Sequence, residues 1–136
     1  MPIDSLAGMR TLRSFVNKEV PSRVVATSRE IAKFALEKAI QLSPIETGRF
    51  MASWRVTLSP ALTTPASPGS RSASSAAAEA LSQSDSALRS LKFGQPFFIV
   101  NDVPYSPYVE YGTPKVEPHY ITRRVAMSIG GKFGRI

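Results

Sequence analysis

Apolar residues recur at helical spacing in three stretches of the chain, and they predict amphipathic helices over residues 5–19, 21–42 and 119–129. The second pattern is the longest and the most regular. We expect that helix to end before Pro44, because the residue preceding a proline avoids the α region. The third helix is expected to stop at the Gly130-Gly131 pair, since glycine commonly follows the last turn of a helix. The apolar positions of the three helices are Leu6, Met9, Leu12, Phe15 and Val16, then Val24, Ile31, Phe34, Ala35 and Leu42, then Ile121, Val125 and Ile129.

Two shorter stretches have the pattern of β-strands. Apolar and polar residues alternate over residues 50–58, as in a strand with one buried face, and Trp54 is its expected core anchor. Residues 97–100 are a short apolar run after a Gly-Gln-Pro turn, and they predict a second strand. Together with the helices, these strands predict an α+β domain. In it, a long N-terminal helix packs on a small antiparallel sheet, and a C-terminal helix completes the fold.

The segment between the two predicted strands has a different composition. Residues 59–70 are rich in proline, serine and threonine, and residues 72–90 are rich in alanine and serine. This composition predicts a loop followed by a weak helix over about 73–91. The length of the chain fits one domain, so we expect a single domain over residues 1–136 with a variable insertion at about 59–92. Such insertions are usually functional or disordered, and one hypothesis is that this one orders only against neighbouring chains.

The side chains available for chemistry argue against an enzyme. The chain has no cysteine, which excludes disulfides and thiolate metal sites, and its only histidine is His119. No nucleophile elbow is present. Asp102, Glu110 and Glu117 lie near His119 in the sequence, but not at a metal-ligand spacing. We therefore predict a non-enzymatic protein with no catalytic residues, no metal and no cofactor.

The N-terminus lacks the basic region and the apolar core of a signal peptide, and no apolar run approaches the length of a membrane helix. We expect a protein that is made in a cytoplasm and has no membrane partner. The formal net charge is +7, and two interpretations of it stay open. The basic side chains are either solvated helix faces or a surface that faces DNA or an acidic partner. The candidates for that surface come from the acid-free end of the chain: Arg123, Arg124, Lys132 and Arg135.

A first motif spans residues 43–50 and reads Ser-Pro-Ile-Glu-Thr-Gly-Arg-Phe. Ser43 is a candidate helix cap, with Pro44 at the first helical position and Glu46 completing a capping box. Thr47 and Gly48 would then end the turn, because glycine accepts a positive φ. The motif thus predicts a rigid corner between the long helix and the Trp54 strand, and a role in subunit contact is compatible with that.

A second motif spans residues 101–114 and combines three tyrosines, three prolines, a glycine and Glu110. We expect a broken strand or a short helical turn that ends at Gly112. If Glu110 is buried, its carboxylate needs a cationic or backbone partner. Two hypotheses for the tyrosines stay open. Either they pack over the sheet edge with wet hydroxyls, or they dock onto another subunit, as tyrosines often do at interfaces. These tyrosines are Tyr105, Tyr108 and Tyr111.

The two motifs, in this order and after a long helix, resemble the tail-completion or neck family of tailed bacteriophages. In that family the corner typically reads Pro-x-acid-Thr-Gly, and Glu46 stands at the acid position here. The second motif typically reads Tyr-Ala-x-x-Val-Glu-aromatic-Gly-Thr, and Ser106 replaces the alanine here. The resemblance covers about residues 20–58 and 95–130, and it does not extend to the Ala/Ser-rich segment between them.

The resemblance implies a non-enzymatic structural protein of the virion, made in the host bacterial cytoplasm. Such a protein forms a homo-oligomeric ring in the neck and joins the DNA-filled head to the tail. Its implied partners are the connector or adaptor, the tail terminator or tail tube, and DNA in the channel. The alternatives are a tail terminator of the same virion region and a small basic nucleic-acid-binding protein. The residues implied in the motif and in subunit contact are Pro44, Glu46, Thr47, Gly48, Trp54, Tyr105, Tyr108, Glu110, Tyr111, Gly112 and Thr113.

Overall fold

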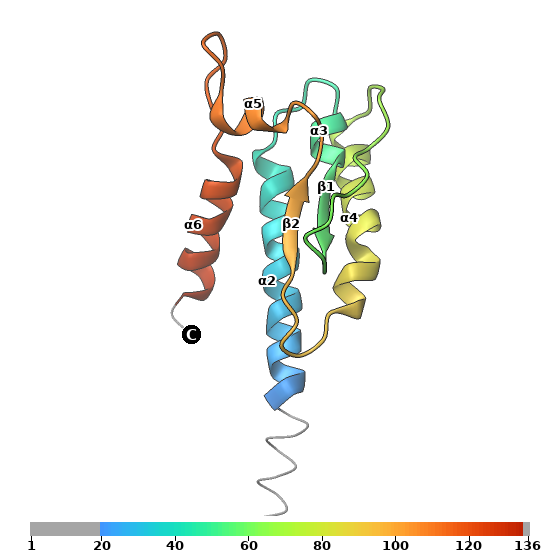
Figure 1. The fold of residues 1–136 in the computed structure, drawn as a ribbon, viewed down its shortest axis with the longest axis vertical. Helices are drawn as coiled ribbons and strands as arrows, with labels where there is room; N and C mark the ends of the chain where they lie inside the picture. The colour runs from blue at the N-terminus through green and yellow to red at the C-terminus, as the bar shows by residue number, and fades with distance from the viewer. Residues whose placement is uncertain (1–19, 135–136) are drawn as a thin grey trace, which may run out of the picture.

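The computed structural model describes residues 20–134, so the predicted helix over residues 5–19 and Arg135 lie outside the described part of the chain. It confirms an α+β fold in which a long helix packs on a two-stranded antiparallel sheet, with a helix at the C-terminal end (Figure 1). The elements are α2 (Val20–Leu42), α3 (Arg49–Ala52), β1 (Trp54–Thr57), α4 (Ala73–Ser90), β2 (Phe98–Asn101), α5 (Ser106–Tyr111) and α6 (Ile121–Phe133).

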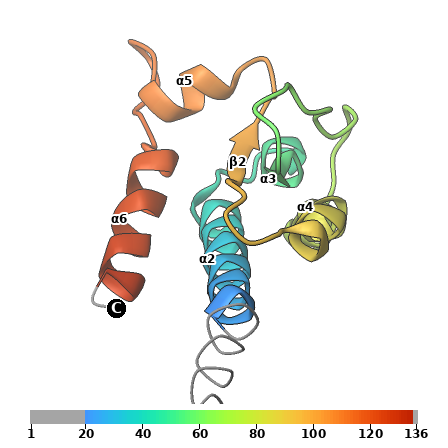
Figure 2. The same cartoon turned by 60° about the horizontal axis from the view of Figure 1, so that its bottom comes forward.

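The long helix α2 is the central element, and α4 and α6 lie on opposite sides of it (Figure 2). Its buried face is made mainly of alanines, which let neighbouring elements approach closely. The predicted end before Pro44 is confirmed, because the helix stops at Leu42. Val24 was expected on the buried face, but 41% of its surface is exposed. The fully buried residues of α2 are Ala32, Ala35, Leu36 and Ala39.

The sheet pairs β1 with β2, and Trp54 lies opposite Asn101. Trp54 is buried, as predicted for a core anchor. The prediction of one strand over residues 50–58 is wrong at its N-terminal end, where residues 49–52 form the short helix α3. The alternation was misleading because both sides of this segment are buried. Met51 and Arg55, expected to face solvent, are covered as well.

The Ala/Ser-rich helix α4 belongs to the core of the same chain. Ala76, Ala80 and Ser84 are fully buried, and α4 packs against α3, β1 and α2. The Ser84 hydroxyl accepts a hydrogen bond from the Val56 amide at 3.0 Å, so it satisfies a donor on the outer edge of β1. Ser84 therefore takes part in packing, whereas the other serines of α4 are exposed, and α4 buries its apolar face within the same chain.

The C-terminal helix α6 packs on α2 through Ile121 and Val125, both buried. The prediction that it stops at the Gly130-Gly131 pair is wrong, because it continues to Phe133. Tertiary contacts outweigh the low helix propensity of glycine here: the Phe133 ring meets Phe34 of α2 edge-on, with centroids 5.6 Å apart. No helix among residues 20–134 is long and apolar enough to span a membrane.

Candidate binding site

The two sequence motifs line one hollow of about 580 Å³, at the end of the molecule where α2 stops and α5 crosses above it (Figure 1). The corner wall, residues 44–50, supplies one side. The tyrosine wall, residues 105–119, supplies the other, and the loop at Pro68 and Gly69 closes a third. Of the residues that the sequence implied, seven line the hollow, whereas Trp54, Glu110, Tyr111 and Gly112 lie behind or beside it. The seven are Pro44, Glu46, Thr47, Gly48, Tyr105, Tyr108 and Thr113.

The corner wall is joined to the core by a buried serine. The Ser43 hydroxyl donates to the Ala39 carbonyl at 2.6 Å and accepts the indole N–H of Trp54 at 2.7 Å. The predicted capping box is therefore wrong: residues 43–48 are not helical, the next helix begins only at Arg49, and Glu46 is exposed. The buried indole donor needs an acceptor, and the Ser43 hydroxyl supplies it.

Gly48 is the turning point of the corner wall. Its φ of +81° confirms the predicted left-handed conformation. A Cβ at this position would lie 2.6 Å from the carbonyl oxygen of Arg71, far inside van der Waals contact. The neighbouring Thr47 carbonyl accepts the Arg71 amide at 2.8 Å. Glycine is therefore required both by the backbone conformation and by the close approach of the second chain segment.

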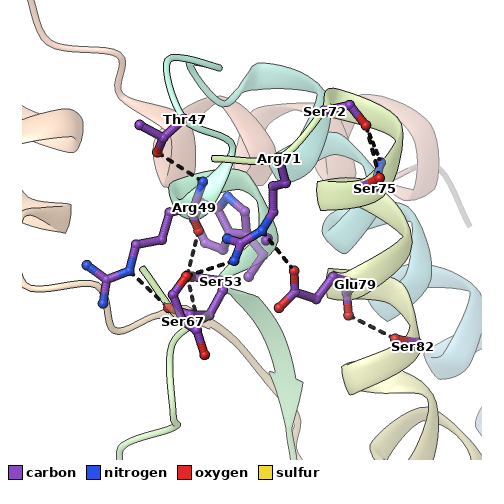
Figure 3. Close-up of polar contacts among 12 residues, drawn as sticks. Thr47, Arg49, Ser53, Ser67, Arg71, Ser72, Ser75, Glu79 and Ser82 are labelled. Atoms are coloured by element: carbon purple, nitrogen blue, oxygen red, sulfur yellow. Dashed lines mark hydrogen bonds and ion pairs between the residues drawn. The ribbon is translucent and has the colours of Figure 1, made fainter. Parts of the chain in front are cut away.

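A polar network behind the corner wall fixes the loop before α4 (Figure 3). The Arg71 guanidinium forms an ion pair with Glu79 at 3.3 Å and donates to the Ser67 carbonyl at 2.7 Å. The Ser53 hydroxyl donates to the Arg49 carbonyl and accepts the Ala66 amide. Sequence reasoning missed these residues because no periodic pattern marks them, although their partners lie only four to thirteen residues away in the chain.

Buried charge lies near this network. Arg55 donates to the Trp54 carbonyl at 2.9 Å and also contacts the Ala52 carbonyl. Burial lowers the pKa of the Arg55 guanidinium, and the Glu79 carboxylate opposes that shift. Arg55 thus has backbone partners and an acidic neighbour, so it serves the core and is not presented to the hollow.

The tyrosine wall is held at its base and exposed at its surface. The Tyr105 ring lies 6.3 Å from the Phe50 ring and is half-buried. Tyr108 and Tyr111 are 61% and 72% exposed, and no residue of α5 is buried. The structure therefore separates the three tyrosines: Tyr105 packs onto the core, whereas Tyr108 and Tyr111 face outward.

Glu110 connects the tyrosine wall to α6. Its carboxylate accepts the Thr122 amide at 3.1 Å and the Thr122 hydroxyl. Glu110 is not buried, so the expectation made for a buried carboxylate does not apply to it. The bond places a negative charge at the N-terminus of α6, where the helix dipole favours one. The backbone carbonyl of Glu110 also accepts the Tyr120 amide at 3.0 Å. Glu110 is therefore a helix-capping residue of the fold.

A small hairpin extends from the end of α5. Gly112 has φ +76° and ψ 179°, a combination that is essentially restricted to glycine. A Cβ there would lie 2.7 Å from the Val116 carbonyl oxygen. The Thr113 amide donates to the same carbonyl at 2.9 Å, which closes the hairpin. Gly112 thus positions Thr113 and Val116 on the rim of the hollow.

His119 lines the hollow with one hydrogen-bonding atom unmatched. Its backbone N–H donates to the Val109 carbonyl at 2.9 Å. Its side-chain Nδ1 is buried and has no hydrogen-bond partner in the described part of the chain. No group of three or more His, Asp or Glu side chains within residues 20–134 is arranged to hold a metal ion. Atoms of the chain itself cover this nitrogen, so Nδ1 is not presented to the hollow.

The basic candidates of α6 divide into two kinds. Arg123 and Arg124 are exposed on its first turn, with the Arg123 guanidinium 6.0 Å from the Tyr120 ring centre. Lys132 is engaged with the aromatic pair at the other end, its Nζ lying 4.6 Å from the Phe34 ring centre. The first turn therefore presents a small basic surface, separate from the hollow.

No family model, curated protein or solved structure matches the chain.

Proposed function

We propose that this chain is a non-enzymatic structural protein of a tailed-phage virion. It acts in the neck, where a homo-oligomeric ring joins the DNA-filled head to the tail during tail completion. The observation that carries the proposal is the hollow. The two motifs on which the resemblance rests are separated in the chain by β1, α4 and β2, yet they face each other across it.

The rim of the hollow has the properties of a recognition surface. Among the residues that line it, Tyr108 is mostly exposed and about half of Val116 is exposed, whereas Tyr111 and Ile45 are exposed but do not line it. Large apolar side chains gathered in one exposed area usually mark an interaction site, and tyrosine is enriched at such sites. The candidate general bases among the described residues that line the hollow are His119 and Glu46. No hydrogen bond described within residues 20–134 joins either side chain to a nucleophile, which supports an adaptor over a catalyst.

The proposal is tested in a phage from which the gene for this chain has been deleted. Electron microscopy is expected to show filled heads and finished tails that remain separate. A wild-type copy supplied in trans should restore joined particles, and a copy with Tyr108→Ala should not. Met127→Ala is the matched control, because Met127 is 69% exposed but lies outside the hollow. Normal joined particles without the protein would rule the proposal out.

A second candidate is a small basic nucleic-acid-binding protein, favoured by the exposed Arg123 and Arg124 and by the net charge of +7. This candidate requires that the isolated protein binds duplex DNA with an affinity that falls as salt rises. Arg123→Glu with Arg124→Glu should then abolish binding in a fluorescence anisotropy titration. In a neck ring that contacts DNA only in its channel, the same pair of changes would instead impair DNA retention in assembled particles.

A tail terminator would differ only in its position within the neck, which immunogold labelling measures.

A further inference from the structure

The hollow is an apolar site without an occupant in the described part of the chain. Its walls are formed largely by proline, aromatic and aliphatic side chains, and its volume of about 580 Å³ is in the range of ligand-binding pockets. The rim at Tyr108 and Val116 is exposed and apolar, which favours a partner there. An occupant that matches this rim carries apolar side chains.

We infer that the occupant is the N-terminal segment, residues 5–19, of a neighbouring copy of the chain. This segment has apolar residues at helical spacing, among them Leu12 and Phe15, interleaved with Thr11 and Ser14. An amphipathic helix that lays its apolar face in a groove is a common recognition mode. The charged side chains among the described residues that line the hollow, Glu46 and Arg49, balance each other, so the match of the segment to the hollow rests on its apolar residues.

The reach of the segment decides between its own hollow and that of a neighbour. Helix α2 has 23 residues and is therefore about 35 Å long. The segment joins α2 at Val20, whereas the hollow begins at Pro44, past the opposite end (Figure 1). As the helix that its pattern predicts, residues 5–19 would span only about 22 Å. Such a helix cannot return to the hollow of its own chain.

This arrangement gives each copy one arm to donate and one hollow to fill. Such a contact is head-to-tail, because the two surfaces that meet are different, and repeated contacts close into a ring when the rotation between copies permits. The closure of these contacts into a ring rests on the proposed function, whereas the arm contact itself does not. It adds the contact by which neighbouring copies recognise each other.

The absence of cysteine from the chain makes a cross-linking test clean. One full-length chain carries Phe15→Cys, and a second, with a different tag, carries Val116→Cys on the rim. After mixing and mild oxidation, a disulfide-linked heterodimer is expected on a non-reducing gel. A partner with Met127→Cys, which is exposed on α6 but does not line the hollow, should give none. Adding Leu12→Asp to the Phe15→Cys chain should abolish the linked product.

A chain that carries Phe15→Cys and Val116→Cys together tests the reach. It is expected to give linked species of two or more chains, whereas a monomer closed by an internal disulfide would contradict the inference. Equal linking to Val116→Cys and Met127→Cys, or none to either, would also overturn it. These outcomes are separable from the proposed function: cross-linking uses the isolated protein, and head–tail joining is scored in particles. Failed linking with deletion particles that stay unjoined would reject the arm contact alone.

Discussion

The corner wall and the tyrosine wall line the same hollow, but the protein holds them differently. The corner wall is continuous with the core through the Ser43–Trp54 hydrogen bond and the close approach of Gly48 to Arg71. The tyrosine wall rests on short helix α5, which has no buried residue. The comparison indicates that core contacts fix the corner wall, whereas the exposed side chains of the tyrosine wall are available for recognition. Substitutions in the two walls should therefore separate stability from binding.

The largest effect is expected from Gly48→Ala in the corner wall. A side chain would have to adopt a left-handed conformation, and its Cβ would clash with the Arg71 carbonyl. The two costs together should lower the free energy of unfolding by about 2–4 kcal/mol. Urea denaturation followed by circular dichroism measures the loss.

Gly94→Ala is the matched control for this prediction. Gly94 has a similar φ of +75°, but a Cβ there would have no atom within 4 Å. Only the conformational cost remains, so we expect a loss of about 1–2 kcal/mol. Equal losses for the two variants would show that the approach of Arg71 is not what fixes the corner wall.

The corner wall also shows how far the sequence could lead. The end of α2 and the positive φ of Gly48 follow from local rules about proline and glycine, and both were predicted correctly. The capping box at Ser43 was wrong because the hydroxyl bonds to Trp54, which lies eleven residues further along. Likewise, α3 was taken for part of a strand because contacts from α4 bury the side that was expected to face solvent. Local patterns carry no information about such distant partners.

The tyrosine wall was predictable in a different way. Its composition and Gly112 predicted a broken strand or a short helical turn that ends at Gly112, and both packing and docking stayed open for the tyrosines. That the carboxylate would cap α6 could not be foreseen, because α6 was expected to begin at His119 and in fact begins after Tyr120. Convergence of the two motifs on one hollow is a property of the tertiary fold alone. The resemblance rested on the order of the two motifs along the chain and made no prediction about their positions in space.

A smaller effect is expected from Glu110→Gln, because the native Glu110 side chain joins the tyrosine wall to α6. The change keeps the shape of the side chain but removes the negative charge that accepts the Thr122 amide and hydroxyl. The free energy of unfolding should fall by about 0.5–2 kcal/mol. Hydrogen exchange at the Thr122 amide should become faster, which locates the effect at the start of α6.

Glu117→Gln serves as the control, because Glu117 is exposed on the hairpin and none of the contacts described within residues 20–134 involves its side chain. Its effect on stability should stay within about 0.5 kcal/mol. If both variants changed the free energy of unfolding by the same small amount, the Glu110 bond to α6 would not stabilise the fold. The tyrosine wall would then contribute even less to stability relative to the corner wall.

The smallest effect on stability is expected from Tyr108→Ala, although its effect on assembly should be the clearest. Tyr108 is mostly exposed, so its loss should change the free energy of unfolding by no more than about 0.5 kcal/mol. Tyr105→Ala, in the same wall but packed near Phe50, should cost about 1–2 kcal/mol. Thermal denaturation of the two variants makes the comparison.

The choice of Tyr108 alone matters for the interpretation. Combining it with Glu110→Ala would remove a helix cap together with a rim side chain, and a failure to assemble would then have two explanations. With Tyr108→Ala, a folded protein that no longer joins heads to tails identifies the rim as a binding surface. A folded protein that joins them normally would mean that the tyrosine wall, despite its exposure, is not where the partner binds.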